Sequence, residues 1–316
     1  MLVTGAFGFI GSHLVEQLLD SDENVVAAGM APPHEDNLHQ ILKHRNSMKI
    51  RVAYVDFTNL QQVRALFKSF QPRVVYHLAA IASHRLSKAD PYSYLSNNYN
   101  AVLAILEAAR LMEPTPKIVY TSSSSVYGDQ QPPLHEGLSP KPQGPYALSK
   151  LLGEQLCKHY HDEYGLECPV IRYFNIVGER CRSNIVFKIF ADRISRGEAV
   201  EIYGRVVGGL FRPAERDFTY VKDAVRGTVL AGERGMGCEV YNIGFGRPVS
   251  VRRVAELMMK HFGKNVKVVE RELKLHEVLV SFSDNRKARE HLGWSPTTDI
   301  EEMVKRYVDW YRSFAL

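Results

Sequence analysis

Two side chains one helical turn apart could transfer a proton. Tyr146 and Lys150 lie four residues apart in a segment that begins with Pro145, a residue typical of the first turn of a helix. Positions i and i+4 share one face of a helix, so the ammonium group can lie beside the phenol. A nearby positive charge favours the phenolate and lowers a pKa that is ordinarily about 10. Tyr146 is therefore a candidate acid/base, and an ordinary surface pair is the alternative that the spacing leaves open.

Four consecutive serines, residues 122–125, directly follow an apolar segment at 118–121. If that segment is a strand of a parallel sheet, the serines lie at its carboxyl end, where doubly wound folds bind their ligands. A hydroxyl there can bind a substrate oxygen or relay a proton. Serines also end strands and cap the turns that follow, which accounts for two or three of the four. We expect one of them to be catalytic.

Three glycines near the N-terminus have the spacing of a phosphate-binding turn. Gly5, Gly8 and Gly11 lie between an apolar segment at 1–4 and an amphipathic segment at 11–19. Glycine there permits a tight turn, close approach of backbone N–H groups to a pyrophosphate, and close contact between helix and strand. The positive end of the helix dipole then faces the anion. The pattern predicts a dinucleotide site, with a purely structural turn as the alternative.

The next strand lacks the residue that usually selects the cofactor. An NAD site generally carries an acidic residue about 20 residues after the first glycine, whereas here the strand at 24–28 ends in Gly29. An arginine that would bind the 2′-phosphate of NADP is missing there too, so the choice between NAD and NADP stays open. Asp56 can accept a hydrogen bond from the adenine amine or cap a helix beside Thr58.

Apolar segments alternate with helical patterns through the first half, which predicts an α/β fold with a Rossmann-type, doubly wound parallel sheet. We expect a dinucleotide-binding domain at 1–175, with returning segments near 218–245, and a smaller α+β substrate domain at 176–316. The expected strands are 1–4, 24–28, 51–55, 74–80 and 118–121, and the expected helices are 11–19, 60–70, 98–112 and 146–164.

The composition excludes several classes of function. The chain has 316 residues, 45% hydrophobic and 24% charged, and no apolar run approaches the roughly 20 residues that span a membrane. Its net charge of +5 (40 Lys and Arg against 35 Asp and Glu) is not gathered in a block that would indicate nucleic-acid binding. The four cysteines form no C-x-x-C pair, so we expect no metal site. With no secretory signal pattern, a cytoplasmic location is expected.

The motifs together resemble the extended short-chain dehydrogenase/reductases of the nucleotide-sugar epimerase/dehydratase family, most closely the UDP-sugar 4-epimerases. The resemblance covers nearly the whole chain. It is carried by T-G-x-x-G-x-x-G at 4–11, Y-H-L-A-A at 76–80, Asn98 ahead of L-E-A-A-R at 106–110, S-S-S-V-Y-G at 123–128, Tyr146 with Lys150, R-Y-F-N at 172–175, R-D-F-T-Y-V at 216–221, Y-N-I-G at 241–244 and L-G-W-S-P at 292–296.

The resemblance assigns roles by position. It implies that Ser123, Tyr146 and Lys150 are catalytic. It implies a homodimer formed by the helices at 98–112 and 146–164, and a nucleotide-diphosphate sugar as the substrate. Substrate contacts are expected from Ser123, Asn175, Arg216 and Lys274. Bound NAD, with NADP left open, is expected to contact Gly5, Phe7, Gly8, Phe9, Ile10, Gly11, Asp56, Phe57, Leu78, Ala79, Ala80, Asn98, Tyr146, Lys150 and Phe174.

Departures from the family pattern narrow the reaction. Dehydratases carry an Asp-Glu pair where this chain has Ser124 and Ser125, and the glutamate typical of decarboxylases is missing from this stretch. Lys274 replaces an expected arginine and loses its bidentate fork, and the stretch between Tyr203 and Arg216 is longer than usual. The pattern favours a nucleotide-sugar 4-epimerase that works through hydride transfer to NAD and a 4-keto intermediate. An NADPH-dependent ketosugar reductase and a non-catalytic dinucleotide sensor are the alternatives.

Overall fold

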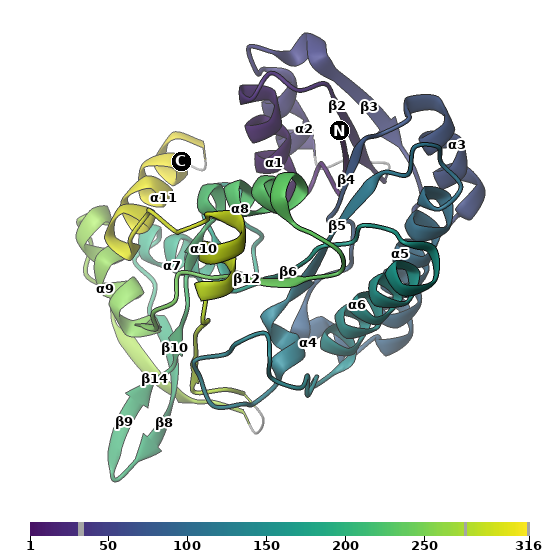
Figure 1. The fold of residues 1–316 in the computed structure, drawn as a ribbon. Coiled ribbons are helices and arrows are strands. Elements are labelled where there is room, and N and C mark those ends of the chain that lie inside the picture. Colours follow the sequence, from purple (N-terminus) through teal and green to yellow (C-terminus); the bar gives the residue numbers. More distant parts are fainter. Residues whose placement is uncertain (31–34, 275–276, 315–316) are drawn as a thin grey trace.

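The computed structural model describes residues 1–30, 35–274 and 277–314. Its centre is a seven-stranded sheet in the order β12-β6-β5-β4-β1-β2-β3, in which every neighbouring pair is parallel (Figure 1). The predicted α/β doubly wound sheet is confirmed. The strands are β1 (Leu2–Thr4), β2 (Val25–Gly29), β3 (Ile50–Tyr54), β4 (Val74–His77), β5 (Lys117–Ser123), β6 (Val170–Tyr173) and β12 (Val240–Ile243).

Helices cover both faces of this sheet, which is why its strands are apolar on both sides. Alternate residues of β1 show this, because Leu2 packs into one hydrophobic core and Val3 into the other. One face carries α3 (Leu60–Phe70), α5 (Pro91–Ala109) and α6 (Pro145–Tyr164). The other carries α1 (Phe9–Asp20), α2 (Glu35–Leu42), α8 (Val221–Arg234) and α10 (Arg286–Leu292), and short helices lie at η1 (Ser47–Lys49), α4 (His84–Ser87) and η2 (Ser124–Tyr127).

Local capping explains the largest difference from the predicted boundaries. Helix α5 begins at Pro91, seven residues before the predicted start at Asn98. Its N-cap is Asp90, whose Oδ1 accepts a hydrogen bond from Ser93 N at 3.1 Å, and proline at the first helical position needs no donor there. Strand β4 ends at His77, so residues 78–80 lie in the loop that follows it.

One of the two segments expected to return to the sheet does so. Strand β12 pairs with β6 and forms the edge of the central sheet. Thr219–Tyr220 (β11) instead pairs with Ile176–Val177 (β7) in a separate two-stranded sheet, so the expectation that it joins the central sheet is wrong. Helix α8 follows it directly and packs beside α1.

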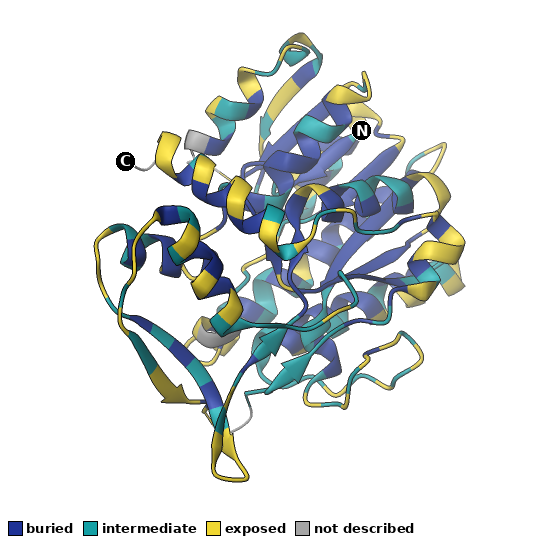
Figure 2. Ribbon diagram, turned by 90° about the vertical axis from the view of Figure 1, so that its left-hand side faces the viewer, coloured by how far each residue is buried: buried dark blue, intermediate teal, exposed yellow. Residues whose placement is uncertain are grey.

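The remaining segments build small sheets beside the carboxyl ends of β5 and β6. Strands β8 (Val200–Val207) and β9 (Leu210–Pro213) form a hairpin that projects from the molecule, and Figure 2 shows its tip exposed while the central sheet is buried. In the described ranges, no helix is both long and apolar enough to cross a membrane. The elements are α7 (Val186–Ser195), β8 (Val200–Val207), β9 (Leu210–Pro213), β10 (Glu215–Arg216), β13 (Val249–Ser250), α9 (Val251–Phe262), β14 (Val268–Glu272), β15 (Val280–Ser281) and α11 (Ile300–Phe314).

Candidate active site

The glycine turn brings α1 into close contact with β1 and the end of β4. Gly5 has a φ of +66°, and a Cβ there would lie 2.9 Å from Ala79 N. A Cβ on Gly11 would lie 2.1 Å from Gly5 O, so a side chain at either position would force the backbone apart. Gly8 N donates a hydrogen bond to Gly5 O at 3.0 Å and closes the turn. These glycines therefore serve the close packing that a dinucleotide turn requires.

The N-terminus of α1 is open toward solvent and fits a pyrophosphate. Its N-cap is Gly8, which is exposed and has no side chain to accept hydrogen bonds from the first turn. That turn contains no acidic residue. The N–H groups of the first turn and the positive end of the helix dipole are thus available to an anion. The surrounding residues fit a dinucleotide cofactor.

Packing explains why β2 ends in glycine rather than in an acidic residue. A Cβ on Gly29 would lie 2.4 Å from Cδ2 of Phe7, whose side chain is 4% exposed. Phe7 also contacts the ring of Tyr54, with centroids 5.9 Å apart, and its carbonyl accepts a hydrogen bond from Asn37 Nδ2 at 2.9 Å. Phe7 therefore packs between the glycine turn and the end of β2. The buried Asn37 was not foreseen from the sequence, because no motif places it against Phe7.

Asp56 lies in a local turn at the end of β3. Its Oδ1 accepts hydrogen bonds from Thr58 N at 2.9 Å and from Thr58 Oγ1 at 2.7 Å. The N-cap of α3 is Asn59, so the alternative that Asp56 caps this helix is wrong. The adjacent Phe57 is buried and meets the ring of His77 edge-on at 6.4 Å. A cofactor contact by Asp56 or Phe57 stays a prediction.

The loop after β4 is fixed by a hydroxyl that sequence reasoning did not single out. Thr4 Oγ1 accepts hydrogen bonds from Leu78 N and Ala79 N, both at 3.1 Å, and lies 2.8 Å from His77 Nδ1. Burial lowers the pKa of His77 to about 3, so its imidazole is neutral. Thr4 thus holds residues 78–80, Ala80 included, beside the glycine turn. Its place as the threonine of the T-G-x-x-G-x-x-G motif was the signal for it.

Asn98 joins this loop to the helix that carries Tyr146. Its Oδ1 accepts from Ile81 N at 2.8 Å, and its Nδ2 donates to Ile81 O at 3.1 Å and to Ser149 Oγ at 2.9 Å. Ser149 Oγ in turn donates to Tyr146 O at 2.8 Å. The side chain is buried with both amide groups bonded to protein. Any effect of Asn98 on a cofactor therefore passes through the loop it holds.

The structure brings Ser123 and Tyr146 into contact. Ser123 is the last residue of β5, and its side chain hydrogen-bonds the hydroxyl of Tyr146. Ser123 Oγ also accepts from Ser125 N at 3.2 Å and from Ser125 Oγ at 3.0 Å. Ser124 begins the short helix η2, so the other serines turn the chain away from the strand, as expected. Ser123 is the serine that faces the tyrosine.

The pKa of Tyr146 is set mainly by its surroundings. Burial raises the pKa above its ordinary value, while the hydrogen bond with Ser123 and the positive charge of Arg182 act to lower it. The expectation that Lys150 lowers this pKa from about 10 toward the working pH is therefore wrong for this structure. Ser123 and Arg182 are the groups that favour the phenolate here.

Lys150 lies one turn further along α6 and points toward β5. Its Nζ donates a hydrogen bond to Thr121 O at 2.8 Å and lies 5.3 Å from the ring centre of Tyr120. Burial lowers the pKa of Lys150 to about 8, and the carboxylate of Glu154 acts in the opposite direction. The ammonium is thus held by the carbonyl of the strand that ends in Ser123, which explains why it does not pair with the phenol.

The residues after β6 are divided between the core and the surface. Phe174 is fully buried and packs against Tyr127, with ring centroids 6.1 Å apart, so its side chain supports the site from beneath. Asn175 is exposed and has a φ of +26°, a left-handed conformation that asparagine tolerates better than most residues. Its carbonyl accepts a hydrogen bond from Thr219 N at 3.3 Å. Asn175 is the one of the two that can reach a substrate.

Three cationic residues approach one segment of the second half. Arg216 Nη1 donates to Leu279 O at 3.1 Å, and burial lowers the pKa of its guanidinium while Glu277 opposes that change. Arg205 Nη2 donates to Glu277 O at 2.7 Å. Lys274 is exposed, and its backbone N donates to Glu277 Oε2 at 3.1 Å. Arg205 was not predicted as a site residue, and only the unusual length of its segment indicated it.

A fourth cation lies near the acid/base. Arg182, in the loop between β7 and α7, donates from Nη1 to the carbonyl of Ala82, in the loop after β4. Its positive charge acts on the hydroxyl of Tyr146. Sequence reasoning missed Arg182 because no motif places this loop against residue 82.

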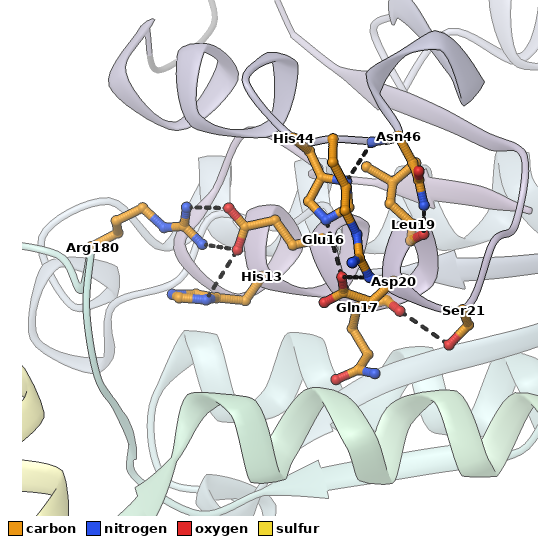
Figure 3. Close-up of polar contacts among 10 residues, drawn as sticks. His13, Glu16, Gln17, Leu19, Asp20, Ser21, His44, Asn46 and Arg180 are labelled. Atoms are coloured by element: carbon orange, nitrogen blue, oxygen red, sulfur yellow. Dashed lines mark hydrogen bonds and ion pairs between the residues drawn. The ribbon is translucent and has the colours of Figure 1, made fainter.

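The loop that carries Arg182 is fixed to α1. Arg180 makes a bidentate ion pair with Glu16, at 2.6 and 2.7 Å, and His13 Nε2 lies 3.0 Å from Glu179 O. Figure 3 shows Arg180 reaching from its loop to Glu16, with His13 beside the pair. Burial lowers the pKa of His13 to about 3, so the neutral ring donates to this carbonyl. The glycine-turn helix thereby positions the loop of Arg182.

Comparison with known proteins gives one consistent relationship. The family described as GDP-mannose 4,6-dehydratase matches residues 2–307. A UDP-glucuronate 4-epimerase of Thermodesulfobacterium geofontis is 33% identical over 98% of this chain and 95% of its own length.

Two solved structures match over nearly the full length of both chains. The UDP-glucose 4-epimerase of Thermotoga maritima with UDP-glucose has a TM-score of 0.89 and 31% identity, covering 100% of this chain and 99% of that one. The UDP-glucuronic acid 4-epimerase of Bacillus cereus, in complex with UDP-glucuronic acid and NAD, has a TM-score of 0.88 and 31% identity, covering 99% and 98%. This chain therefore belongs to the GDP-mannose 4,6-dehydratase family, within the nucleotide-sugar epimerases and dehydratases of the short-chain dehydrogenase/reductase type.

Proposed function

We propose that this protein is an NAD-dependent epimerase that inverts C4 of a UDP-linked sugar. The observation that carries the proposal is the contact between Ser123 and Tyr146, with Lys150 one helical turn further on. These residues lie at the carboxyl end of β5, beside the loop that adjoins the glycine turn. Relatives that act on UDP-sugars, one of them bound to NAD, support the same reading.

The chain's own residues supply the proton transfers. Tyr146 takes the proton from the sugar 4-hydroxyl and later returns a proton to the same oxygen, which Ser123 polarises by hydrogen bonding. When bound, NAD supplies a hydride acceptor and donor at C4. Lys150 provides a positive charge beside the reacting groups. Inversion requires the 4-keto sugar to turn its opposite face toward the hydride donor, and Tyr146 then reprotonates the 4-oxygen.

Separate groups of residues would bind the pyrophosphate of NAD and the UDP-sugar. The open N-terminus of α1, with Phe9 and Ile10 after the glycines, would hold the pyrophosphate of NAD through backbone N–H groups. Arg216 and Lys274, with Asn175 at the sugar end, would hold the UDP-sugar. Lys274 is a point charge without a guanidinium fork, so Arg216 carries the bidentate contact to the diphosphate.

Incubation of the purified protein with separate UDP-sugars tests the reaction. We expect conversion of one C4 epimer into the other without added cofactor, followed by proton NMR of the sugar, and release of NAD on denaturation. Stoichiometric consumption of NADPH would identify a ketosugar reductase instead. Cofactor binding without any conversion would identify a sensing module. Either of these results contradicts the proposal.

Arg182 favours a sugar with a C5 carboxylate as the substrate. It is an exposed cation whose charge acts on the hydroxyl of Tyr146, so it can pair with an anionic group next to C4. Arg182→Gln should lower kcat/KM for UDP-glucuronate about 10- to 100-fold, because a charged hydrogen bond contributes about 1.5–3 kcal/mol. Conversion of UDP-glucose should fall less, because only the effect of the Arg182 charge on Tyr146 is lost there. Equal losses on both sugars would contradict a uronate substrate, and Arg253→Gln, an exposed change on α9, is the control.

We also propose a homodimer in which the outer faces of α5 and α6 pack against the same helices of a second copy. Exposed apolar side chains on these helices support it, among them Tyr92 at 82% and Leu148 at 39% exposure. Light scattering should give twice the 35.8 kDa chain mass, and Leu148→Glu should give the monomer. The cytoplasmic location expected from the sequence belongs to the same proposal, and cell fractionation tests it.

A further inference from the structure

A buried ion pair lies directly behind the candidate catalytic residues. Glu154 of α6 accepts hydrogen bonds from Arg172 Nε at 2.9 Å and from Arg172 Nη2 at 2.6 Å. Their side chains are 6% and 4% exposed. Ser122 Oγ also donates to Glu154 Oε1. The carboxylate therefore joins α6 to β5 and β6 in a place that water does not reach.

The ion pair lies next to two parts of the catalytic group, the end of β5 and Lys150. Ser122 precedes Ser123 in β5 and lies opposite Arg172 in the β5–β6 register. Glu154 follows Lys150 by one helical turn, so both side chains lie on the same face of α6. The end of β5 and the ammonium of Lys150 are thus held relative to the same carboxylate.

Glu154 also acts on Lys150 through its charge. The groups facing Lys150 are Glu154 and Cys157 on α6, Tyr120 on β5 and the neutral His77 on β4. Glu154 is the carboxylate among them, and its charge raises the pKa of Lys150 against the effect of burial. Arg172 pairs with this carboxylate and offsets part of its charge.

We propose that Glu154 and Arg172 are positioning residues for the reaction. The pair holds the end of β5 against α6 so that Ser123 meets Tyr146, and the balance of its two charges sets how firmly Lys150 keeps its proton. The inference rests on the proposed function, in which Lys150 works as a cation. Neither residue touches the substrate or the cofactor, so both act through their neighbours.

Two substitutions with opposite electrostatic effects test the proposal. Glu154→Gln removes the anion and should move the loss of activity at alkaline pH to lower pH by about one unit. Arg172→Gln removes the positive charge that offsets this carboxylate, so the loss of activity at alkaline pH should move to higher pH. If the pair were merely structural, both variants would be less stable, but the pH at which activity is lost would not move in opposite directions. Shifts of the same sign, or no shift, would overturn the proposal.

Direct titration of the lysine keeps this test independent of turnover. Carbon-13 NMR of labelled lysine Cε, with the Lys150 signal assigned from Lys150→Met, should give the same opposite shifts in pKa. If the wild-type protein had no epimerase activity, the proposed function would fail while this titration still tested the charge relation.

Milder and more distant changes complete the design. Glu154→Asp keeps the charge, so its pH profile should stay near that of the wild-type protein even if Glu154→Gln or Arg172→Gln does not fold. A displaced profile in Glu154→Asp would contradict the proposal. Glu163→Gln, an exposed change on the same helix, is the matched control and should leave the profile unchanged.

Discussion

Asn98 on α5 and Ser149 on α6 are joined by a buried hydrogen bond of 2.9 Å between Asn98 Nδ2 and Ser149 Oγ. The same asparagine bonds both backbone groups of Ile81, and Ser149 bonds the carbonyl of Tyr146. One amide therefore fixes the loop after β4 relative to the first turn of the helix that carries the acid/base. No sequence motif links the loop after β4 to the first turn of α6, so their separation depends on this amide.

Asn98→Ala should destabilise the protein and loosen this separation. It removes two part-buried hydrogen bonds to the backbone of Ile81 and the buried bond to Ser149, and each such bond contributes about 0.5–1.5 kcal/mol. We expect the free energy of unfolding in urea to fall by at least about 2 kcal/mol. Asn97→Ala, which removes one half-buried bond to Ser93 O on the same helix, should cost less than half as much. If the two variants lost similar free energies of unfolding, the Asn98 hydrogen bonds would not stabilise the fold more than the Asn97 bond does.

Lys150→Met should stabilise the fold at neutral pH while removing activity. Burial lowers the pKa of Lys150 from 10.5 to about 8, so the unfolded chain binds the proton more tightly and folding is penalised below pH 8. This penalty of about 3 kcal/mol is offset in part by the bond to Thr121 O, which leaves a net gain of roughly 2 kcal/mol for the methionine variant. The penalty disappears as the pH rises from 8 to 10.5, so the advantage of the variant should shrink over that window. Urea unfolding at pH 7 and pH 10 measures it, and an advantage that does not fall with pH would contradict the assignment.

The fold could be predicted because its signals are local. Strands buried on both faces are apolar throughout, and glycines at residues 5, 8 and 11 are required by contacts within one turn. Tyr146 and Ser123 were likewise found from an i to i+4 pair and from the end of a strand. Their meeting follows from the packing of α6 against β5 and the short helix η2 that follows it.

Other parts of the site depend on contacts between distant segments. The direction of Lys150 is decided by the carbonyl of Thr121, and the place of Arg182 by the contacts of its loop with α1. Asp56 and Asn59 compete for the same capping role with similar side chains, so spacing alone could not choose between them. Arg205 reaches Glu277 only because β8 pairs with β14, two segments far apart in the chain.

Two glycines of the same turn should respond differently to alanine. Gly11→Ala places a Cβ 2.1 Å from Gly5 O, so the backbone must move, and we expect a loss of stability of at least about 2 kcal/mol. Gly8 has a φ of −81°, which alanine adopts, and its Cβ would meet only Gly5 O at 3.1 Å. Gly8→Ala should therefore fold normally but retain less NAD, because the methyl group occupies the open end of α1. Thermal unfolding and the NAD released on denaturation separate the two effects, and a normal cofactor content in Gly8→Ala would argue against pyrophosphate binding there.

Tyr146→Phe should abolish turnover without unfolding the protein. The substitution removes only the hydroxyl that meets Ser123, and burial of the ring is kept. Loss of a positioned acid/base typically lowers kcat about 10²- to 10⁴-fold. The variant should still retain NAD, because the glycine turn and α1 are untouched. Tyr92→Phe, a change at an exposed tyrosine of α5, is the control and should keep full activity. Retained turnover in Tyr146→Phe would move the acid/base role to another group, whereas loss of NAD together with activity would make Tyr146 a binding residue.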